Sequence, residues 1–111
     1  MDEIASITQE HVQAELKRFP DQVSDHFQIA WVDLSSVMSD RQMTVWARAG
    51  LRLAEQTVRS WEAASLYFKV SPQVAALMPF NYFVKWGECG ADLCQQSPAL
   101  AVAYLEASPG A

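Results

Sequence analysis

The sequence has few cysteines, few histidines and no long apolar run. Two cysteines are too few for the disulfide framework of a small secreted domain, and Cys89 and Cys94 fall on different sides of a helix. Charged residues interrupt every apolar stretch before the roughly 20 residues that a membrane helix needs. The segment 1–20 also lacks the basic start and apolar centre of a signal peptide. These absences predict a cytoplasmic chain with reduced thiols and no membrane association.

Basic residues are also scarce. Eight Lys and Arg stand against thirteen Asp and Glu, which gives a formal net charge of −5 at pH 7. This balance disfavours a general nucleic-acid or anionic-membrane surface and favours a protein partner. Of the 111 residues, 50% are apolar and only 19% are charged, a composition typical of a folded chain and not of a disordered one. The length is that of one domain, so residues 1–111 are expected to form a single helical domain.

The residue pattern offers no signature of catalysis. No Gly-rich phosphate loop, nucleophile elbow or HExxH helix occurs. His11 and His26 fall on separate predicted helices, and neither has a second histidine one turn away, which favours solvent-exposed or capping roles over a metal site. The serines stand where helix caps are needed: Ser6, Ser39, Ser60 and Ser97. We therefore expect no enzyme, no metal and no cofactor.

Apolar residues recur with helical spacing along nearly the whole chain, which predicts an all-α fold of about six helices. A capping box of Ser6 and Gln9 is expected to open a first helix that ends near Phe19, and Asp21 is expected to cap the second. The later helices are expected from Ser39, boxed with Gln42, to about Gln56; from Ser60 to just before Ser71-Pro72; from about Phe80 to Gln95; and from Ser97-Pro98 onward. A separate short helical turn is expected around 74–78.

The most informative pattern is an internal repeat. The motif W-x-x-x-G-x-x-L, a loop, and S-x-x-x-A-x-x-Y-x-x-x-S-P occurs twice. Its copies span about 40–72 and 80–109, and residues 6–38 are expected to form a degenerate helical pair. A period of about 40 residues with two helices per unit predicts antiparallel helical hairpins, stacked as a short repeat array of the HEAT or tetratricopeptide kind.

Glycine recurs inside the predicted helices of this repeat, at Gly50 and Gly90. Glycine within a helix costs roughly 1 kcal/mol relative to alanine, so we expect a close helix crossing at each position, with Ala64 and Ala101 as the matching small residues. The alternative reading of the repeated aromatic residues is a ligand cage made by Trp46, Trp86, Tyr67 and Tyr104. Stripes at helical spacing favour a packed core over such a cage.

Half of the basic residues follow one polar face of the third predicted helix: Arg41, Arg48, Arg52 and Arg59. Arginine suits bidentate contacts with carboxylates, so an acidic protein surface is the expected partner of this stripe. The competing interpretation is a solvated helix face whose charge is relieved by Glu55 and Glu62.

The sixth predicted helix is apolar over most of its circumference, with Glu106 as its only charged residue. A helix that is apolar all round is normally buried on more than one side. Leu100 and Leu105 are therefore candidate apolar contacts. Either the array continues beyond this sequence or this end packs against another chain, and we favour continuation.

A set of residues in 27–111 carries a family resemblance: Trp31, Met38, Trp46, Gly50, Leu51-Arg52-Leu53, Ser60-Trp61-Glu62-Ala63-Ala64, Tyr67-Phe68 and Ser71-Pro72. It resembles the amino-terminal helical repeats of bacterial von Willebrand factor A proteins that accompany MoxR-type AAA+ ATPases, including the Rubisco-activating and nitric-oxide-reductase-activating types. The resemblance implies the helical part of an adaptor that connects a target to the ATPase. The D-x-S-x-S metal motif of the A domain is absent here, so no catalytic residue carries over.

These patterns predict a noncatalytic helical-repeat module for protein interaction, the amino-terminal part of an adaptor that links an AAA+ ATPase to its target complex. Two other functions stay open. One is a freestanding helical domain that homodimerises through its carboxyl-terminal helix, and the other is a small-molecule-binding bundle that uses the aromatic cage. The expected protein-binding residues are the four arginines of the stripe together with Leu100 and Leu105.

Overall fold

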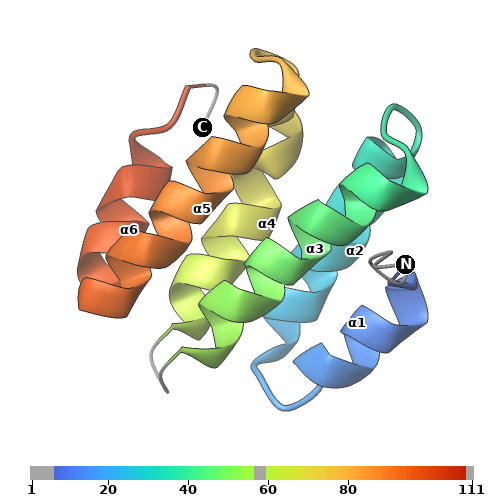
Figure 1. Ribbon diagram of the computed structural model, residues 1–111. Coiled ribbons are helices and arrows are strands. Elements are labelled where there is room, and N and C mark those ends of the chain that lie inside the picture. The colour runs from blue at the N-terminus through green and yellow to red at the C-terminus, as the bar shows by residue number, and fades with distance from the viewer. Residues whose placement is uncertain (1–6, 57–59, 110–111) are drawn as a thin grey trace, which may run out of the picture.

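The computed structural model describes residues 7–56 and 60–109, and within these ranges it contains six helices and no strand (Figure 1). The helices are α1 (Gln9–Leu16), α2 (Asp21–Ser35), α3 (Asp40–Glu55), α4 (Trp61–Ala75), α5 (Phe80–Gln96) and α6 (Pro98–Glu106). The predicted all-α fold is confirmed.

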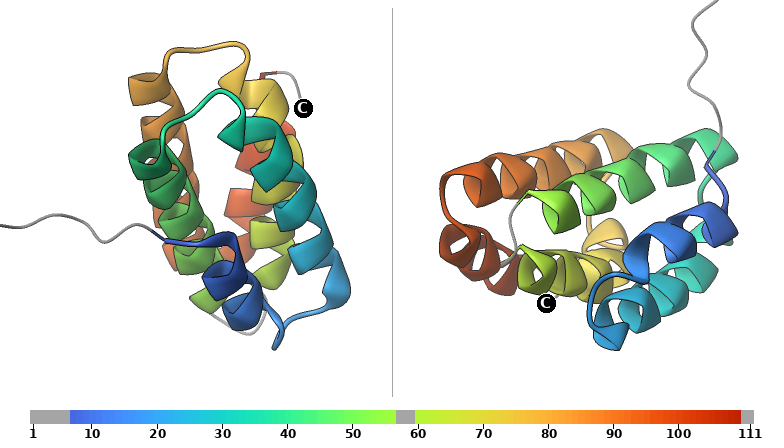
Figure 2. Two further views of the ribbon diagram at one scale, coloured as in Figure 1. Left: turned by 90° about the vertical axis from the view of Figure 1, so that its right-hand side faces the viewer. Right: turned by 90° about the horizontal axis from the view of Figure 1, so that it is seen from below.

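The helices form antiparallel hairpins that stack in two layers. One layer holds α3 and α5 side by side, and the other holds α2, α4 and α6 (Figure 2). The short helix α1 packs against both α2 and α3. Each of the later helices contacts its hairpin partner and the helix two places along the chain, as in a helical-repeat array.

Local sequence correctly predicts where α3 begins, but it predicts the wrong cap residues for α1 and α2. Ser39 and Gln42 form the predicted capping box, in which each side chain bonds the backbone N–H of the other residue. The predicted box of Ser6 and Gln9 is wrong: α1 starts at Gln9, and its cap is Thr8, whose hydroxyl accepts from the backbone N–H of His11. Ser6 itself lies outside the described residues. Because the cap is Thr8, two residues after Ser6, Gln9 is the first helical residue. It is not three residues after the cap, as the second member of a capping box must be.

The second helix starts one residue earlier than expected, and the first ends earlier. Pro20 is the cap of α2, so Asp21 is the first helical residue and not the cap. A carboxylate there is still favourable because it faces the positive end of the helix dipole. The helix α1 ends at Leu16, and a turn then brings the backbone N–H of Phe19 onto the carbonyl of Leu16.

The helix α4 runs through Pro72, where the sequence predicted its end. Proline removes one backbone donor, but Val70 and Val74 are buried on either side of it and hold this turn against the core. The backbone N–H of Ala76 still bonds the Pro72 carbonyl at 3.2 Å. The separate turn predicted at 74–78 is therefore partly the last turn of α4.

A ladder of stacked aromatic rings runs through the core between the layers. The ring of Phe27 stacks on Trp46 with centroids 5.7 Å apart, Trp46 stacks on Tyr67 at 6.1 Å, and Tyr67 stacks on Trp86 at 5.3 Å. These rings come from α2, α3, α4 and α5 in turn. The ladder therefore joins all three hairpins through their interfaces.

Within the α3–α4 hairpin, three residues of the repeat motif form a closed set of hydrogen bonds. The indole Nε1 of Trp46 donates to Ser71 Oγ at 2.9 Å, Ser71 Oγ donates to the Tyr67 carbonyl at 2.5 Å, and the Tyr67 hydroxyl donates to the Trp46 carbonyl at 3.0 Å. All three residues are buried. The motif therefore satisfies every polar group that its large aromatic side chains bring into the core.

The α5–α6 hairpin has the same set of bonds at the repeated positions. Trp86 Nε1 donates to Ser108 Oγ at 2.6 Å, Ser108 Oγ donates to the Tyr104 carbonyl at 3.1 Å, and the Tyr104 hydroxyl donates to the Trp86 carbonyl at 3.1 Å. Ser108 lies after the end of α6, whereas Ser71 lies within α4. The repeated serine thus connects the tryptophan and the tyrosine of its hairpin, whether or not the second helix of the hairpin extends to it.

Alkaline pH is expected to destabilise the fold through the buried Tyr67. Burial raises the pKa of Tyr67 well above its ordinary value of 10.0, while the unfolded chain ionises near that value. The stabilisation is therefore complete below about pH 10 and is lost as pH rises beyond it, at about 1.4 kcal/mol per pH unit for one group. Urea denaturation between about pH 8 and 11 should show a steep fall in the free energy of unfolding, and a shallower one for Tyr67→Phe. Equal slopes in the two proteins would assign the fall to other groups.

Candidate functional site

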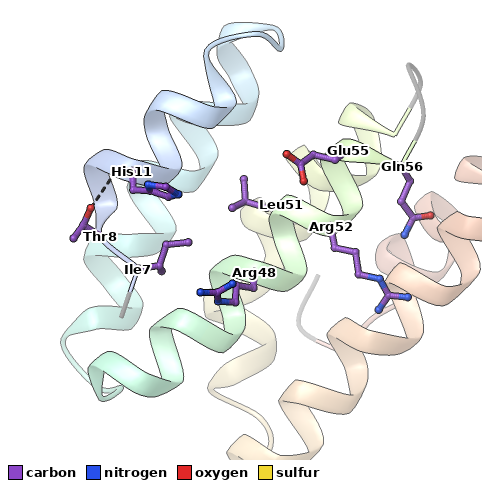
Figure 3. A pocket seen from close by; sticks show the side chains of 8 residues that line it. All are labelled: Ile7, Thr8, His11, Arg48, Leu51, Arg52, Glu55 and Gln56. Atoms are coloured by element: carbon purple, nitrogen blue, oxygen red, sulfur yellow. Dashed lines mark hydrogen bonds between the residues drawn. The ribbon is translucent and has the colours of Figure 1, made fainter. Parts of the chain in front are cut away.

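The exposed side of α3 carries Arg41, Arg48 and Arg52, three of the four predicted arginines, and borders a hollow of about 660 Å³. This hollow lies between α3 and the amino-terminal part of α1 (Figure 3). The two helices and the residues next to their ends supply its lining, which consists of Ile7, Thr8, His11, Arg48, Leu51, Arg52, Glu55 and Gln56. The backbone N–H of Ile7 bonds the Thr44 hydroxyl at 3.0 Å and fixes one edge of the hollow to α3.

A second hollow of about 270 Å³ lies on the other side of α3, against α5. Its lining is mostly apolar, and its residues are Val45, Trp46, Arg48, Ala49, Arg52, Tyr67, Phe83, Val84 and Glu88. Arg48 and Arg52 line both hollows. We call this surface, from the α1 hollow across the two arginines to the α5 hollow, the arginine face.

Acidic side chains pair with the basic residues around the arginine face. Arg52 donates from Nη2 to Asp92 Oδ1 at 2.8 Å, and both side chains are about half exposed or more. Glu55, which lines the α1 hollow, accepts at Oε2 from Nη2 of Arg18 at 2.5 Å. Exposed pairs of this kind are worth about 0–1 kcal/mol, so an incoming carboxylate can replace Asp92 at little cost. Asp92, and not Glu55 or Glu62, is the acidic partner of Arg52.

Gln56 fixes the carboxyl end of α3 relative to α5. Its Nε2 donates to the Ala91 carbonyl at 2.9 Å, and its Oε1 is buried without a hydrogen-bond partner among the described residues. This contact connects the end of α3 to α5 beside the α1 hollow, which Gln56 lines.

The other predicted contact residues have different positions. Arg41 is exposed in the first turn of α3, and Arg59 lies outside the described residues. Leu100 is 49% exposed on α6. Leu105 is fully buried, and its Cδ2 approaches Gly90 of α5. The prediction of Leu105 as a surface contact is wrong, because α5 already covers that side of α6.

No sequence pattern indicates the α1 side of the hollow. Ile7, Thr8 and His11 reach α3 through contacts between segments more than 30 residues apart, such as the bond from Ile7 to Thr44. Such pairings depend on how α1 docks, and no spacing rule within one helix foresees them.

The remaining candidate residues have structural contacts. Trp46 and Tyr67 are each 2% exposed and Trp86 is 6% exposed, and they stack on one another. His26 Nδ1 lies 2.8 Å from the hydroxyl of the buried Ser65 and so connects α2 with α4. Within 7–56 and 60–109, no three His, Cys, Asp or Glu residues gather as a metal site requires.

Comparisons of this chain with protein-family models, curated proteins and solved structures find no match. None of the helices in the described part of the chain has the length and apolar character needed to cross a membrane.

Proposed function

We propose that the chain is a noncatalytic module for protein interaction that binds an acidic segment of another protein across the arginine face. The observation that carries this proposal is the position of Arg48 and Arg52, which stand between two hollows and border both of them. Guanidinium groups there can form bidentate bonds with carboxylates, while the hollows accept neighbouring apolar side chains.

Charge supports the same kind of partner. The whole chain has a formal net charge of −5, whereas the charged residues that line the two hollows balance, Arg48 and Arg52 against Glu55 and Glu88. An acidic partner is therefore repelled less at the arginine face than by the chain as a whole. Electrostatics therefore favours one orientation of binding.

The resemblance to the helical repeats of von Willebrand factor A accessory proteins suggests which partner to test. We propose that the module belongs to an adaptor that couples a MoxR-type AAA+ ATPase to its target complex, with the acidic segment on one of these two. This role needs binding and no bond-making, in keeping with side chains whose contacts serve packing, capping and ion pairing.

Reversal of charge on the arginine face should weaken binding and leave stability nearly unchanged. The double variant Arg48→Glu, Arg52→Glu is expected to raise the Kd for the ATPase or its target complex by about tenfold or more at low salt, with a smaller effect at high salt because exposed charges are screened. Calorimetric titration at two salt concentrations measures both effects.

A second double variant distinguishes the effect of charge on the arginine face from the effect of the net charge of the whole chain. Lys17→Glu, Lys69→Glu changes the net charge by the same amount, and both lysines are exposed away from the two hollows. It should keep most of the affinity. If the two double variants lose affinity equally, net charge alone explains the effect. If the arginine variant keeps its affinity, Arg48 and Arg52 are solvated surface residues that do not bind the partner.

A further inference from the structure

One stripe of the α4 surface is buried and contacts the next hairpin. Its members lie three and four residues apart on one side of the helix and its cap: Ser60, Ala63, Tyr67 and Val70. Their exposed fractions are 0%, 0%, 2% and 6%. Two of them contact α5 directly, since Tyr67 stacks on Trp86 and the Ser60 hydroxyl lies 3.5 Å from Cys94 Sγ.

The repeat places an equivalent stripe on α6, and that stripe is uncovered. Thirty-seven residues after the members of the α4 stripe stand Ser97, Leu100, Tyr104 and Ala107. Leu100 is 49% exposed, Ala107 is exposed, and Ser97 and Tyr104 are partly exposed. The same helix positions are therefore interior in one hairpin and surface in the next.

Tyr104 has the orientation that a following hairpin would need. Its hydroxyl donates to the Trp86 carbonyl, just as the hydroxyl of Tyr67 donates to the Trp46 carbonyl. On the other side of Tyr67 lies the flat face of Trp86, with the ring planes 17° apart. This bond holds the ring of Tyr104 beside the backbone of α5, and no ring among the described residues stacks on it.

The contact that covers Tyr67 also defines what could cover Tyr104. A Cβ added at Gly87 would stand 3.2 Å from the Tyr67 ring, so the covering helix needs a very small residue directly after its tryptophan. Gln56 adds a hydrogen bond to the backbone of that helix, and its equivalent forty residues on, Gln96, is exposed. The covering element is a helix with Trp followed by Gly or Ala.

We propose that the α6 stripe is the docking surface for one more helical hairpin of this repeat type, which presents such a tryptophan to Tyr104. A second copy of this chain does not fit that description. Trp46 and Trp86 are 2% and 6% exposed inside the hairpins, and Trp31 and Trp61 are only partly exposed. The fitting partner is a hairpin whose tryptophan is not already stacked within its own domain.

An extended chain tests whether the stripe accepts such a hairpin. Residues 73–109 are repeated directly after Pro109, because Pro109 is the equivalent of Pro72 and this junction keeps the register of the repeat. The extended chain also carries Leu100→Ala, because the equivalent residue of the covered stripe, Ala63, is an alanine that is fully buried. We expect one cooperative thermal transition at a higher melting temperature than that of the original chain.

Two matched Ala→Glu variants locate the contact. Ala107→Glu introduces a charge on the stripe, at the position equivalent to buried Val70, whereas Ala99→Glu introduces the residue that the repeat already has at the exposed Glu62. In the extended chain Ala107→Glu should lower the melting temperature by at least about 4 °C and Ala99→Glu should leave it nearly unchanged. In the original chain both should have small effects.

Other results would overturn the proposal. If the extended chain shows two separate transitions, one for the appended segment and one unchanged from the original chain, the stripe does not hold a hairpin. Equal effects of the two variants in the extended chain would also contradict it. If sedimentation shows that the original chain dimerises, and Ala107→Glu abolishes the dimer, the stripe belongs to a second copy instead.

Discussion

Replacement of Trp46 by alanine is expected to lower the free energy of unfolding by about 3–5 kcal/mol. The side chain is 2% exposed and its ring stacks on both Phe27 and Tyr67. Its loss leaves a large cavity between three helices and removes the indole donor from the buried Ser71. Urea denaturation monitored by circular dichroism measures the effect, and Trp86→Ala should act in the same direction.

Trp61 supplies the comparison for this prediction. It is partly exposed at the start of α4, so Trp61→Ala should cost less than Trp46→Ala. If Trp46→Ala instead unfolds within about 0.5 kcal/mol of the original protein, the usual range for surface substitutions, Trp46 is not a core residue. The ligand-cage reading of the aromatic residues would then regain support.

Substitutions of two helical glycines are expected to have opposite signs. A Cβ at Gly50 would overlap Cε1 of Phe68, a fully buried ring that contacts Phe27 and Trp46, so a shift of the ring disturbs both contacts. Gly50→Ala should therefore destabilise the protein, by about 1–3 kcal/mol. At Gly90 the nearest atoms are 3.6 Å from the added carbon, an ordinary contact. Gly90→Ala should be neutral or stabilising by up to about 1 kcal/mol, because alanine favours the helix.

Denaturation of the two glycine variants under the same conditions compares the crossings directly. Destabilisation by Gly50→Ala alone supports a crossing that is closer in the first hairpin than in the second. If Gly50→Ala is as stable as the original protein, the Phe68 ring has room to shift and the crossing is not close.

Some parts of the fold that depend on local chemistry were predictable, although the caps of α1 and α2 were not. The capping box of Ser39 and Gln42 and the apolar spacing of α3 involve neighbours within one helix, and both occur as expected. The end of α4 was not predictable, because burial of residues beyond Pro72 outweighs the local preference of proline to stop a helix. The hydrogen bonds of Ser71 also depend on another helix, although the repeated Ser-Pro pair marked the residue.

The candidate site divides in the same way. Arg48 and Arg52 share a face because four residues make about one helical turn, and this follows from spacing alone. Which side of α6 is buried could not be read from its sequence, since the helix is apolar all round and only the position of α5 assigns Leu105 to the interior. The α1 hollow required the docking of two helices that no repeat motif relates.

The most direct test of the arginine face is cross-saturation by nuclear magnetic resonance, with the ¹⁵N-labelled chain bound to the MoxR-type ATPase or to its target complex. The face contains Arg48, Leu51 and Arg52 of α3, flanked by the residues of the two hollows. Binding across it predicts the largest loss of amide signal along this part of α3, reduced by added salt. Signal loss confined to α2 or α6, or none with either partner, would contradict it.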